Sequence, residues 1–208
     1  MATQTATVTK PQQDLAVEQK LQKLRELYAD APEIGKAALK NGLPMLMEEL
    51  SATGRAQTAG RIGARQGKVS ELTVFLPFVK GGAKRLRGLL QLLQGNFRAA
   101  DAVGTVHDMR FVFVDNDTKL LFATAYDGDF DPYIEDFAAK IPNAMDLWLC
   151  NFEGYPGMGN PKAAADWIAS HQIAAEGWYV NSPNLTAAET RRLEKVGKAV
   201  DGLLDQIG

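Results

Sequence analysis

Few side chains in this sequence can do acid–base or ligand chemistry. It contains two histidines, His107 and His171, and one cysteine, Cys150. Imidazole titrates near neutral pH and is the commonest metal ligand, so each histidine is a candidate general base or axial ligand. A lone cysteine excludes an internal disulfide and multi-thiolate sites such as zinc ribbons and iron–sulfur clusters. The chemistry therefore depends on the histidines and their neighbours.

His107 belongs to a β-rich run, residues 105–114. Strand alternation places it on the apolar face, whereas Asp108 and Arg110 point the other way. We interpret His107 as a candidate catalytic base or haem ligand inside an apolar barrel. The alternative is a histidine that is hydrogen-bonded in the core or near a strand end.

Arg110 and Tyr126 complete the candidate catalytic set. Arg110, with Asp108, is a candidate for binding a substrate carboxylate or for the distal polar group of a haem site. The alternative for Arg110 is a structural ion pair with Asp127 or Glu153. Tyr126 is a candidate donor to a ligand oxygen, although a tyrosine whose ring packs with its hydroxyl at the rim is the more common case.

His171 follows Trp167 at helical spacing and precedes Trp178 and Tyr179. A histidine beside aromatic residues, after the last predicted strand, is a plausible position for a proximal haem ligand. We therefore assign His171 as the candidate metal ligand and Tyr179 as a further cofactor contact. The alternative is an ordinary half-buried helix residue.

Other motifs predict structure and not chemistry. Cys150 lies on an expected apolar strand, so we predict a buried, inert thiol. The acidic stretch 126–131 lacks the later glutamate of an EF-hand and is typical of a turn and a helix N-cap. No phosphate-binding glycine motif is present, which argues against nucleotide binding through those folds.

The composition is that of an ordinary globular protein. The 208 residues are 46% hydrophobic, with a formal net charge of −2. A chain without a basic excess has no field that would hold a nucleic-acid backbone, so we expect no nucleic-acid partner. The N-terminal residues lack the pattern of a secretory signal, and no apolar run is long enough to span a membrane. These features predict a cytoplasmic protein.

The chain has two parts. Helical spacing predicts a first helix up to about Pro32 and a second apolar stretch that Pro44 splits near Asn41-Gly42. Residues 51–68 are rich in glycine and basic residues and indicate an exposed linker or mobile loop. We therefore expect an N-terminal helical extension with its linker over 1–68 and an α+β domain over 69–208.

The second part predicts a ferredoxin-like α+β fold. The expected order is strand 71–79, helix 83–94, hairpin strands 105–114 and 119–125, helix 131–140 and strand 144–152, which is a βαββαβ pattern. A further helix is expected near 161–176. Thr186 and Glu189 form a capping box before a last amphipathic helix, which we expect to dock on the body.

The first and fourth predicted strands are apolar on both faces. A sheet of this kind needs a second layer, which a second subunit, the terminal helices or a ligand would supply. We therefore expect a dimeric α+β barrel, or a monomer closed by its own helices, and in either case a place for a cavity.

Three segments resemble a sequence block of poorly characterised bacterial proteins: 104–111, 120–128 and 153–156. The likeness extends over roughly residues 70–181. The element order is similar to that of the dimeric α+β barrel superfamily, which includes chlorite dismutases, dye-decolorising peroxidases and antibiotic-biosynthesis monooxygenases. This resemblance implies haem on a proximal histidine, although the Gly-x-x-Asp-Gly stretch of dye-decolorising peroxidases is missing.

These observations support three hypotheses. The first is a haem-binding oxidoreductase, peroxidase-like or monooxygenase-like, acting on a small organic substrate in an apolar barrel pocket. The second is a cofactor-independent enzyme or binding protein for a small apolar ligand, oriented by His107, Arg110 and Tyr126. The third is a non-catalytic oligomerisation module. All three are compatible with a homo-dimer or other homo-oligomer.

Overall fold

The chain divides into two compact units, residues 1–55 and 56–208. A computed structural model describes residues 10–51 and 57–207 of the chain. The first unit contains three helices, α1 (Lys10–Leu27), α2 (Glu33–Asn41) and α3 (Leu43–Ser51). The predicted break near Asn41-Gly42 is confirmed, since Gly42 separates α2 from α3 and its N–H donates to the carbonyl of Ala38.

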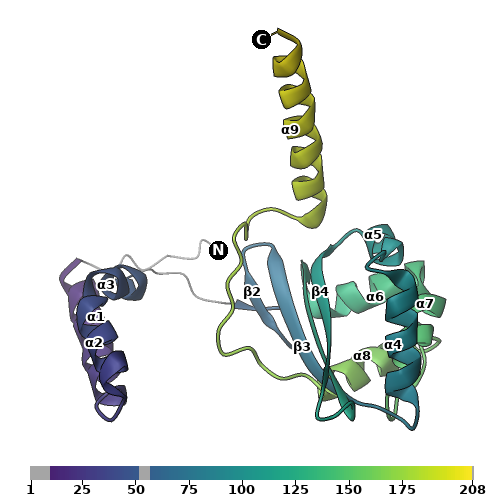
Figure 1. The fold of residues 1–208 in the computed structure, drawn as a ribbon, viewed down its shortest axis with the longest axis horizontal. Coiled ribbons are helices and arrows are strands. Elements are labelled where there is room, and N and C mark those ends of the chain that lie inside the picture. The colour runs from purple at the N-terminus through teal and green to yellow at the C-terminus, as the bar shows by residue number, and fades with distance from the viewer. Residues whose placement is uncertain (1–9, 52–56, 208) are drawn as a thin grey trace, which may run out of the picture. The chain divides into compact units, whose positions relative to one another are not determined.

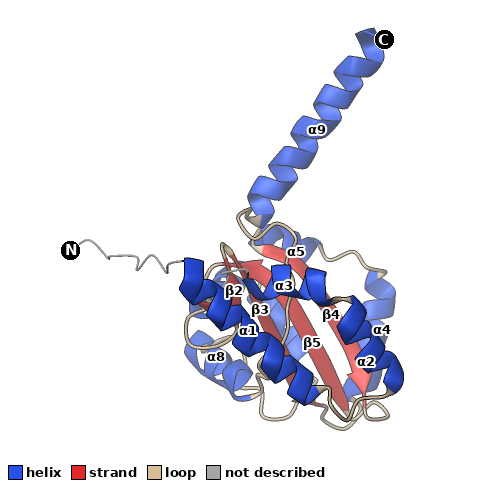
Figure 2. Cartoon of the chain, turned by 90° about the vertical axis from the view of Figure 1, so that its left-hand side faces the viewer, coloured by secondary structure: helices blue, strands red, loops and turns tan. Residues whose placement is uncertain are grey.

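The second unit is an α+β structure, as predicted. Its strands form one antiparallel sheet in the order β1-β2-β3-β5-β4, and most of these strands lie side by side in Figure 2. The elements are β1 (Gln57–Thr58), β2 (Ala64–Gln66), β3 (Val69–Pro77), α4 (Gly82–Leu93), α5 (Arg98–Val103), β4 (Val106–Val114), β5 (Lys119–Asp127), α6 (Phe130–Lys140), α7 (Pro142–Leu149), α8 (Pro161–Ser170) and α9 (Ala187–Ile207).

The predicted hairpin is confirmed, with β5 inside the sheet and β4 at its edge. β4 and β5 pair along nearly their whole length, and β5 also pairs with β3 from Val69↔Asp127 to Pro77↔Lys119. The connecting turn, residues 115–117, has three consecutive residues at positive φ. Asp and Asn tolerate this left-handed conformation better than most residues, which explains the Asp-Asn-Asp sequence.

Residues 57–66, predicted as part of a linker, instead form a short hairpin at the sheet edge. β2 pairs with the start of β3, through Arg65↔Ser70 and Gln66↔Val69. Gly63 has φ +83° and packs so closely that an added Cβ would meet the Glu71 carbonyl oxygen, so glycine is needed there. The unit boundary therefore falls at residue 55 and not at 68. Residues 52–56 of the predicted linker lie outside the described residues.

The predicted fourth strand, residues 144–152, is wrong. This segment is mostly the helix α7, which begins with Pro142 at its first turn. Met145 and Trp148 are buried on the side that faces the core, whereas Leu147 and Cys150 are exposed. Helical packing uses residues three and four apart, so the buried set follows a period of 3.6 and not of 2.

The core lies between one face of the sheet and the helices α4, α6, α7 and α8, which cover that face in Figure 1. β3 contributes Leu72, Val74 and Leu76, which are almost fully buried. Phe130 and Phe137 of α6 fill the space opposite. Packing against these helices fixes the position of the sheet. It therefore also fixes the position of a site on the other face of the sheet.

The opposite face of the sheet, here called the open face, is of mixed character. β3 presents Glu71, Thr73 and Phe75 there, and β4 presents Asp108 and Arg110. No described helix of the second unit covers the open face. The expectation of two apolar faces therefore holds for only part of the sheet.

The last helix does not dock on the second unit as predicted. α9 is held at its first turn and extends away from the sheet in Figure 1. Its capping box is confirmed, since Thr186 N–H donates to the Glu189 carboxylate at 2.7 Å and Glu189 N–H donates to Thr186 Oγ1 at 3.1 Å. Every residue from Arg192 to Gln206 is exposed.

Candidate functional site

The open face carries a groove of about 560 Å³. That volume lies within the range of about 300–1,000 Å³ typical of small-molecule sites. β3 and β4 form its two sides, and the small side chain of Ala123 on β5 lies between them. The lining residues are Glu71, Thr73, Asp108, Arg110, Val112, Leu121, Ala123, Thr124, Ala175, Gly177, Trp178 and Tyr179.

Glu71 is a buried carboxylate in the lining of this groove. The residue is only 4% exposed. Its carboxylate accepts hydrogen bonds from Ala64 N–H and from the Thr73 hydroxyl, both at 3.1 Å. Among the described residues, no basic side chain lies within ion-pair distance of this carboxylate. A buried charge without a partner of opposite sign is costly, so Glu71 stands out from the other acidic residues.

A second carboxylate lies in the same row of the sheet. Glu71 and Asp108 are both paired with Ala125, from β3 and β4 respectively. Neighbouring strands lie about 4.8 Å apart, so the two residues are about 10 Å from each other. Asp108 has Arg110 at 3.7 Å, which partly balances its charge. Glu71 remains the unbalanced carboxylate of the groove.

The segment 175–179 forms one wall of the groove. Gln66 on β2 holds it in place, since the Gln66 side-chain amide donates to the Trp178 carbonyl at 2.9 Å. Trp178 is half-buried and lines the groove, so an aromatic ring is available there. Tyr179 also lines it but is 81% exposed, and its hydroxyl bonds only its near neighbour Asn181.

His107 does not lie in the groove. A β-bulge between Val106 and Asp108 shifts the alternation, and the His107 ring bonds the Asp127 carboxylate at 2.7 Å. Asp127 also accepts from Ala187 N–H at the start of α9. The His107–Asp127 pair thus connects β4, β5 and the start of α9. This structural role is close to the predicted alternative, a histidine that is hydrogen-bonded near a strand end.

The predicted catalytic set is not brought together. Arg110 lies on the open face near Asp108, and it bonds neither Asp127 nor Glu153. Tyr126 lies on the helix-covered face, fully buried and stacked on Tyr133 at 3.9 Å between ring centroids. Burial raises the pKa of the Tyr126 hydroxyl well above its ordinary value. Arg110 and Tyr126 therefore stand on opposite sides of the sheet.

His171 lies beside β3, at the end of α8. Its backbone carbonyl accepts from Phe75 N–H, and its ring Nδ1 lies 2.8 Å from the Trp167 carbonyl. The expected helix over 161–176 ends at Ser170, because the chain from His171 to Ile173 runs along the free part of the β3 edge. His171 and His107 lie on opposite sides of β5 and do not form one site.

The surroundings of the two histidines do not fit a haem. The apolar cavity between the sheet and its helices measures about 50 Å³, and neither histidine lines it. The larger groove on the open face is also lined by neither. Within the described residues, no three His, Cys, Asp or Glu side chains gather as a metal site. We therefore derive no step through haem.

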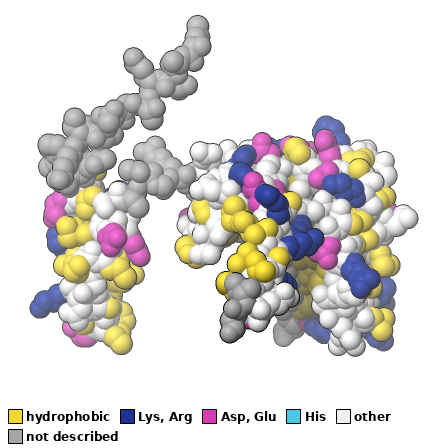
Figure 3. All heavy atoms as spheres, turned by 90° about the horizontal axis from the view of Figure 1, so that it is seen from above, with side chains coloured by type: hydrophobic (Ala, Val, Ile, Leu, Met, Phe, Trp, Pro, Cys, Tyr) yellow, Lys and Arg dark blue, Asp and Glu magenta, His cyan; other side chains and the backbone are white. Residues whose placement is uncertain are grey.

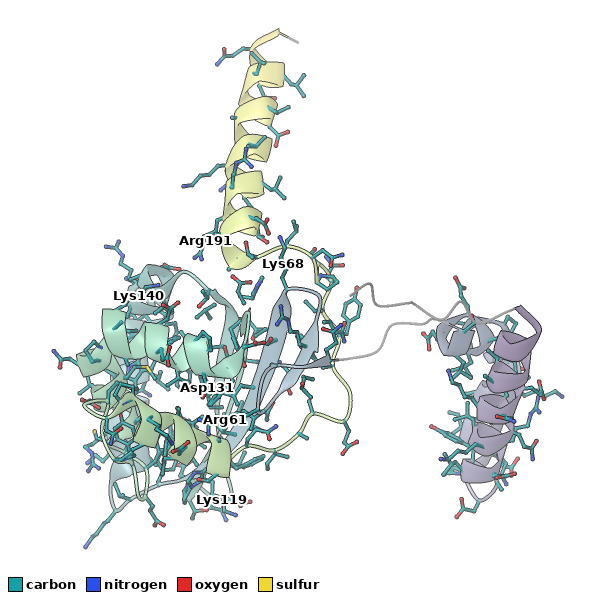
Figure 4. All side chains as sticks on the ribbon, turned by 180° about the vertical axis from the view of Figure 1, so that it is seen from behind. Arg61, Lys68, Lys119, Asp131, Lys140 and Arg191 are labelled. Carbon is teal, nitrogen blue, oxygen red and sulfur yellow. The ribbon has the colours of Figure 1, made fainter. Side chains whose placement is uncertain are left out.

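The remaining candidates have structural roles. Cys150, predicted to be buried, is exposed because it follows α7 and does not lie on a strand. In the acidic stretch, Asp129 pairs with Arg65, and Asp131 pairs with Arg61, as Figure 4 shows for the latter pair. These ion pairs attach the β1–β2 hairpin to the start of α6, in agreement with a role in turn and helix-start structure.

Two further findings bear on function. None of the helices that the structure describes has the length and apolar character needed to cross a membrane. Comparison of the chain with protein-family models, with curated proteins and with solved structures found no match.

Proposed function

We propose that the chain is a binding protein for a small organic cation, which it holds in the groove of the open face. The observation that carries the proposal is the Glu71 carboxylate, buried in a groove of ligand size with no described cationic side chain beside it. An ammonium or guanidinium group of a ligand would supply the missing positive charge.

The other lining residues suit the body of such a ligand. Ala123 and Leu121 provide a low apolar floor, and Trp178 offers an aromatic face at the wall. An aromatic face attracts cations and packs well against flat apolar groups. We therefore expect a ligand with one ammonium group and an apolar or aromatic body. Haem chemistry has no part in this proposal, since neither histidine lines the groove.

The fold gives a reason why the ligand groove lies on the open face of the sheet. β5 lies between β3 and β4 in the sheet, an order that we propose corresponds to half of a ferredoxin-like domain. Helices cover only one face of such a sheet, which leaves the other free for a ligand. In a dimeric α+β barrel a second sheet would occupy the same face, so ligand binding and barrel formation are competing uses of it.

Phenethylammonium tests the proposal, with 3-phenylpropionate as a probe of similar shape and opposite charge. Isothermal titration calorimetry of the full chain should show saturable binding of the cation and at least about tenfold weaker binding of the anion. A hydrogen bond to a charged group contributes about 1.5–3 kcal/mol, which corresponds to that ratio or more.

The matched variants are Glu71→Gln and Glu135→Gln. Glu71→Gln should weaken phenethylammonium binding at least about tenfold, because it removes the charge and keeps the shape. Glu135 is exposed on α6, away from the groove, and its replacement should change nothing. Equal affinity for the two probes in the wild-type chain, or no saturable binding of the cation, would overturn the proposal even if Glu71→Gln failed to fold.

A further inference from the structure

The last helix presents an apolar stripe that no described residue of the second unit covers. Four large side chains stand at spacings of three, four and three residues: Leu193, Val196, Val200 and Leu203. Together with Leu204 they are 48–58% exposed. In Figure 3, where α9 points toward the viewer, hydrophobic side chains gather on one side of the helix.

The spacing of this stripe indicates another helix as its partner. Alternating steps of three and four residues form the narrow seam of a coiled coil, whereas a helix that packs on a sheet or in a globular core has a wider apolar face. Gly197 and Ala199 flank the seam, and small flanking residues allow the axes to approach closely. An apolar stripe of this kind is typical of pairing between helices.

The charges of α9 indicate the orientation of that partner. After the tethered first turn, Arg192, Lys195 and Lys198 make the first half basic against one acidic residue, Glu194. The second half carries Asp201 and Asp205. The last turn carries no basic residue, although the helix dipole would favour one there. After its first turn, α9 therefore has a basic first half and an acidic second half.

We propose that α9 pairs with α9 of a second copy of this chain in antiparallel orientation. The basic half of each helix then lies beside the acidic half of the other. A parallel pair would place like charges side by side. A two-fold axis near Lys198 sets Leu193 against the partner's Leu203 and Val196 against the partner's Val200, so that the four positions form one closed seam.

The attachment of α9 allows this arrangement. Lys68 bonds the Glu189 carboxylate at 2.8 Å, and the Arg191 guanidinium donates to the Gly104 carbonyl. Lys68 and Arg191 are both labelled at the base of the helix in Figure 4. The helix is about 31 Å long, at 1.5 Å per residue for 21 residues. In an antiparallel pair the two sheets lie at opposite ends of the helices and do not obstruct each other.

Sedimentation of the full chain at 100 µM tests the pairing. The expected mass is twice the chain mass of 22.6 kDa. The double variant Val196→Glu/Val200→Glu should sediment as a monomer, because it places charges in the seam. The control Gly202→Glu adds a charge on the opposite side of the helix and should stay dimeric. A monomeric wild-type chain, or a dimer that the double variant leaves intact, would overturn the proposal.

Cysteine cross-linking tests the orientation. In a Cys150→Ser background, chains with Val196→Cys and chains with Val200→Cys should form a disulfide-linked dimer only when the two are mixed and oxidised. Each variant alone should stay unlinked, since the antiparallel seam sets position 196 against position 200. Linking of the Val196→Cys chain with itself would show a parallel pair and contradict the proposal.

Discussion

The Tyr126 hydroxyl and the Glu71 carboxylate are both buried, but they differ in their hydrogen-bond partners and in their access to a groove. The Tyr126 hydroxyl is buried with no hydrogen-bond partner among the described residues, and it lies on the helix-covered face. The Glu71 carboxylate is buried with two donors and opens to a groove. An unpartnered hydroxyl in a closed core is a cost to stability, whereas a carboxylate in a groove is available to a ligand.

Replacement of Tyr126 by Phe should leave the free energy of unfolding unchanged or raise it by up to about 1 kcal/mol, because no hydrogen bond is lost and a buried unpaired hydroxyl is removed. Tyr155→Phe is the contrasting variant. Its hydroxyl donates to Asp146 at 2.6 Å, so its loss should lower the free energy of unfolding by about 1–2 kcal/mol. Urea unfolding measures both, and a larger loss for Tyr126→Phe than for Tyr155→Phe would contradict the interpretation.

At the scale of elements, the start of α9 depends on a carboxylate. Glu189 receives hydrogen bonds from Lys68 and from Thr186, which lower its pKa from 4.5 to about 2. A lowered pKa means that the folded state holds the proton less tightly than the unfolded state does. The cap is therefore fully present above pH 4.5, and its contribution is lost as the pH falls from there toward 2.

The ionisation of Glu189 can be followed by the carboxyl carbon shift in an NMR titration. The wild-type carboxyl should stay ionised at pH 3.5, and its midpoint should lie near 2. Lys68→Ala should move the midpoint upward toward 4.5, because the largest cause of the shift is removed. A wild-type midpoint already near 4.5 would show that the capping box and the lysine do not hold the carboxylate.

At the scale of the whole molecule, the hydrophobic core belongs to one unit. Its buried residues lie between Leu72 and Ile168, and the unit that contains them begins at Ala56. The first unit has Leu21 as its buried large side chain among the described residues. Most of the apolar burial that drives folding is therefore independent of residues 1–55.

A chain without residues 1–55 should fold and unfold cooperatively. Its thermal midpoint, followed by circular dichroism, should lie within a few degrees of that of the full chain, because no residue of the core is removed. A broad, non-cooperative transition in the shortened chain would show that the first unit is part of the fold of the second.

The sequence predicts the elements whose signals are local. Alternating β-formers and an Asp-Asn-Asp turn identify β4 and β5, and Thr186 with Glu189 identifies the start of α9. The strand predicted at 144–152 is wrong, because its apolar residues fit helical spacing as well as strand alternation. Met145, Trp148, Leu149 and Phe152 stand at helical spacing after Pro142, so the signal for α7 was present.

The groove could be predicted only in part. Glu71 and Arg110 are both charged residues within β-rich runs of the sequence, and Arg110 belongs to the predicted catalytic set. The burial of Glu71 depends on contacts with Ala64 and Thr73, and the wall of the groove depends on the bond from Gln66 to the segment at Trp178. These partners are separated by up to 112 residues, and no local pattern records such contacts.

The order of the two core layers along the chain has a consequence during synthesis. The sheet is complete once Asp127 has been made, but the helices that cover its apolar face continue to Ser170. At about 5–20 residues per second, the ribosome needs about 2–9 s to add that stretch. For this interval the nascent sheet exposes Leu72, Phe111 and Phe122 without α6, α7 and α8 to cover them. During this window the apolar face of the sheet is open to contact with other chains.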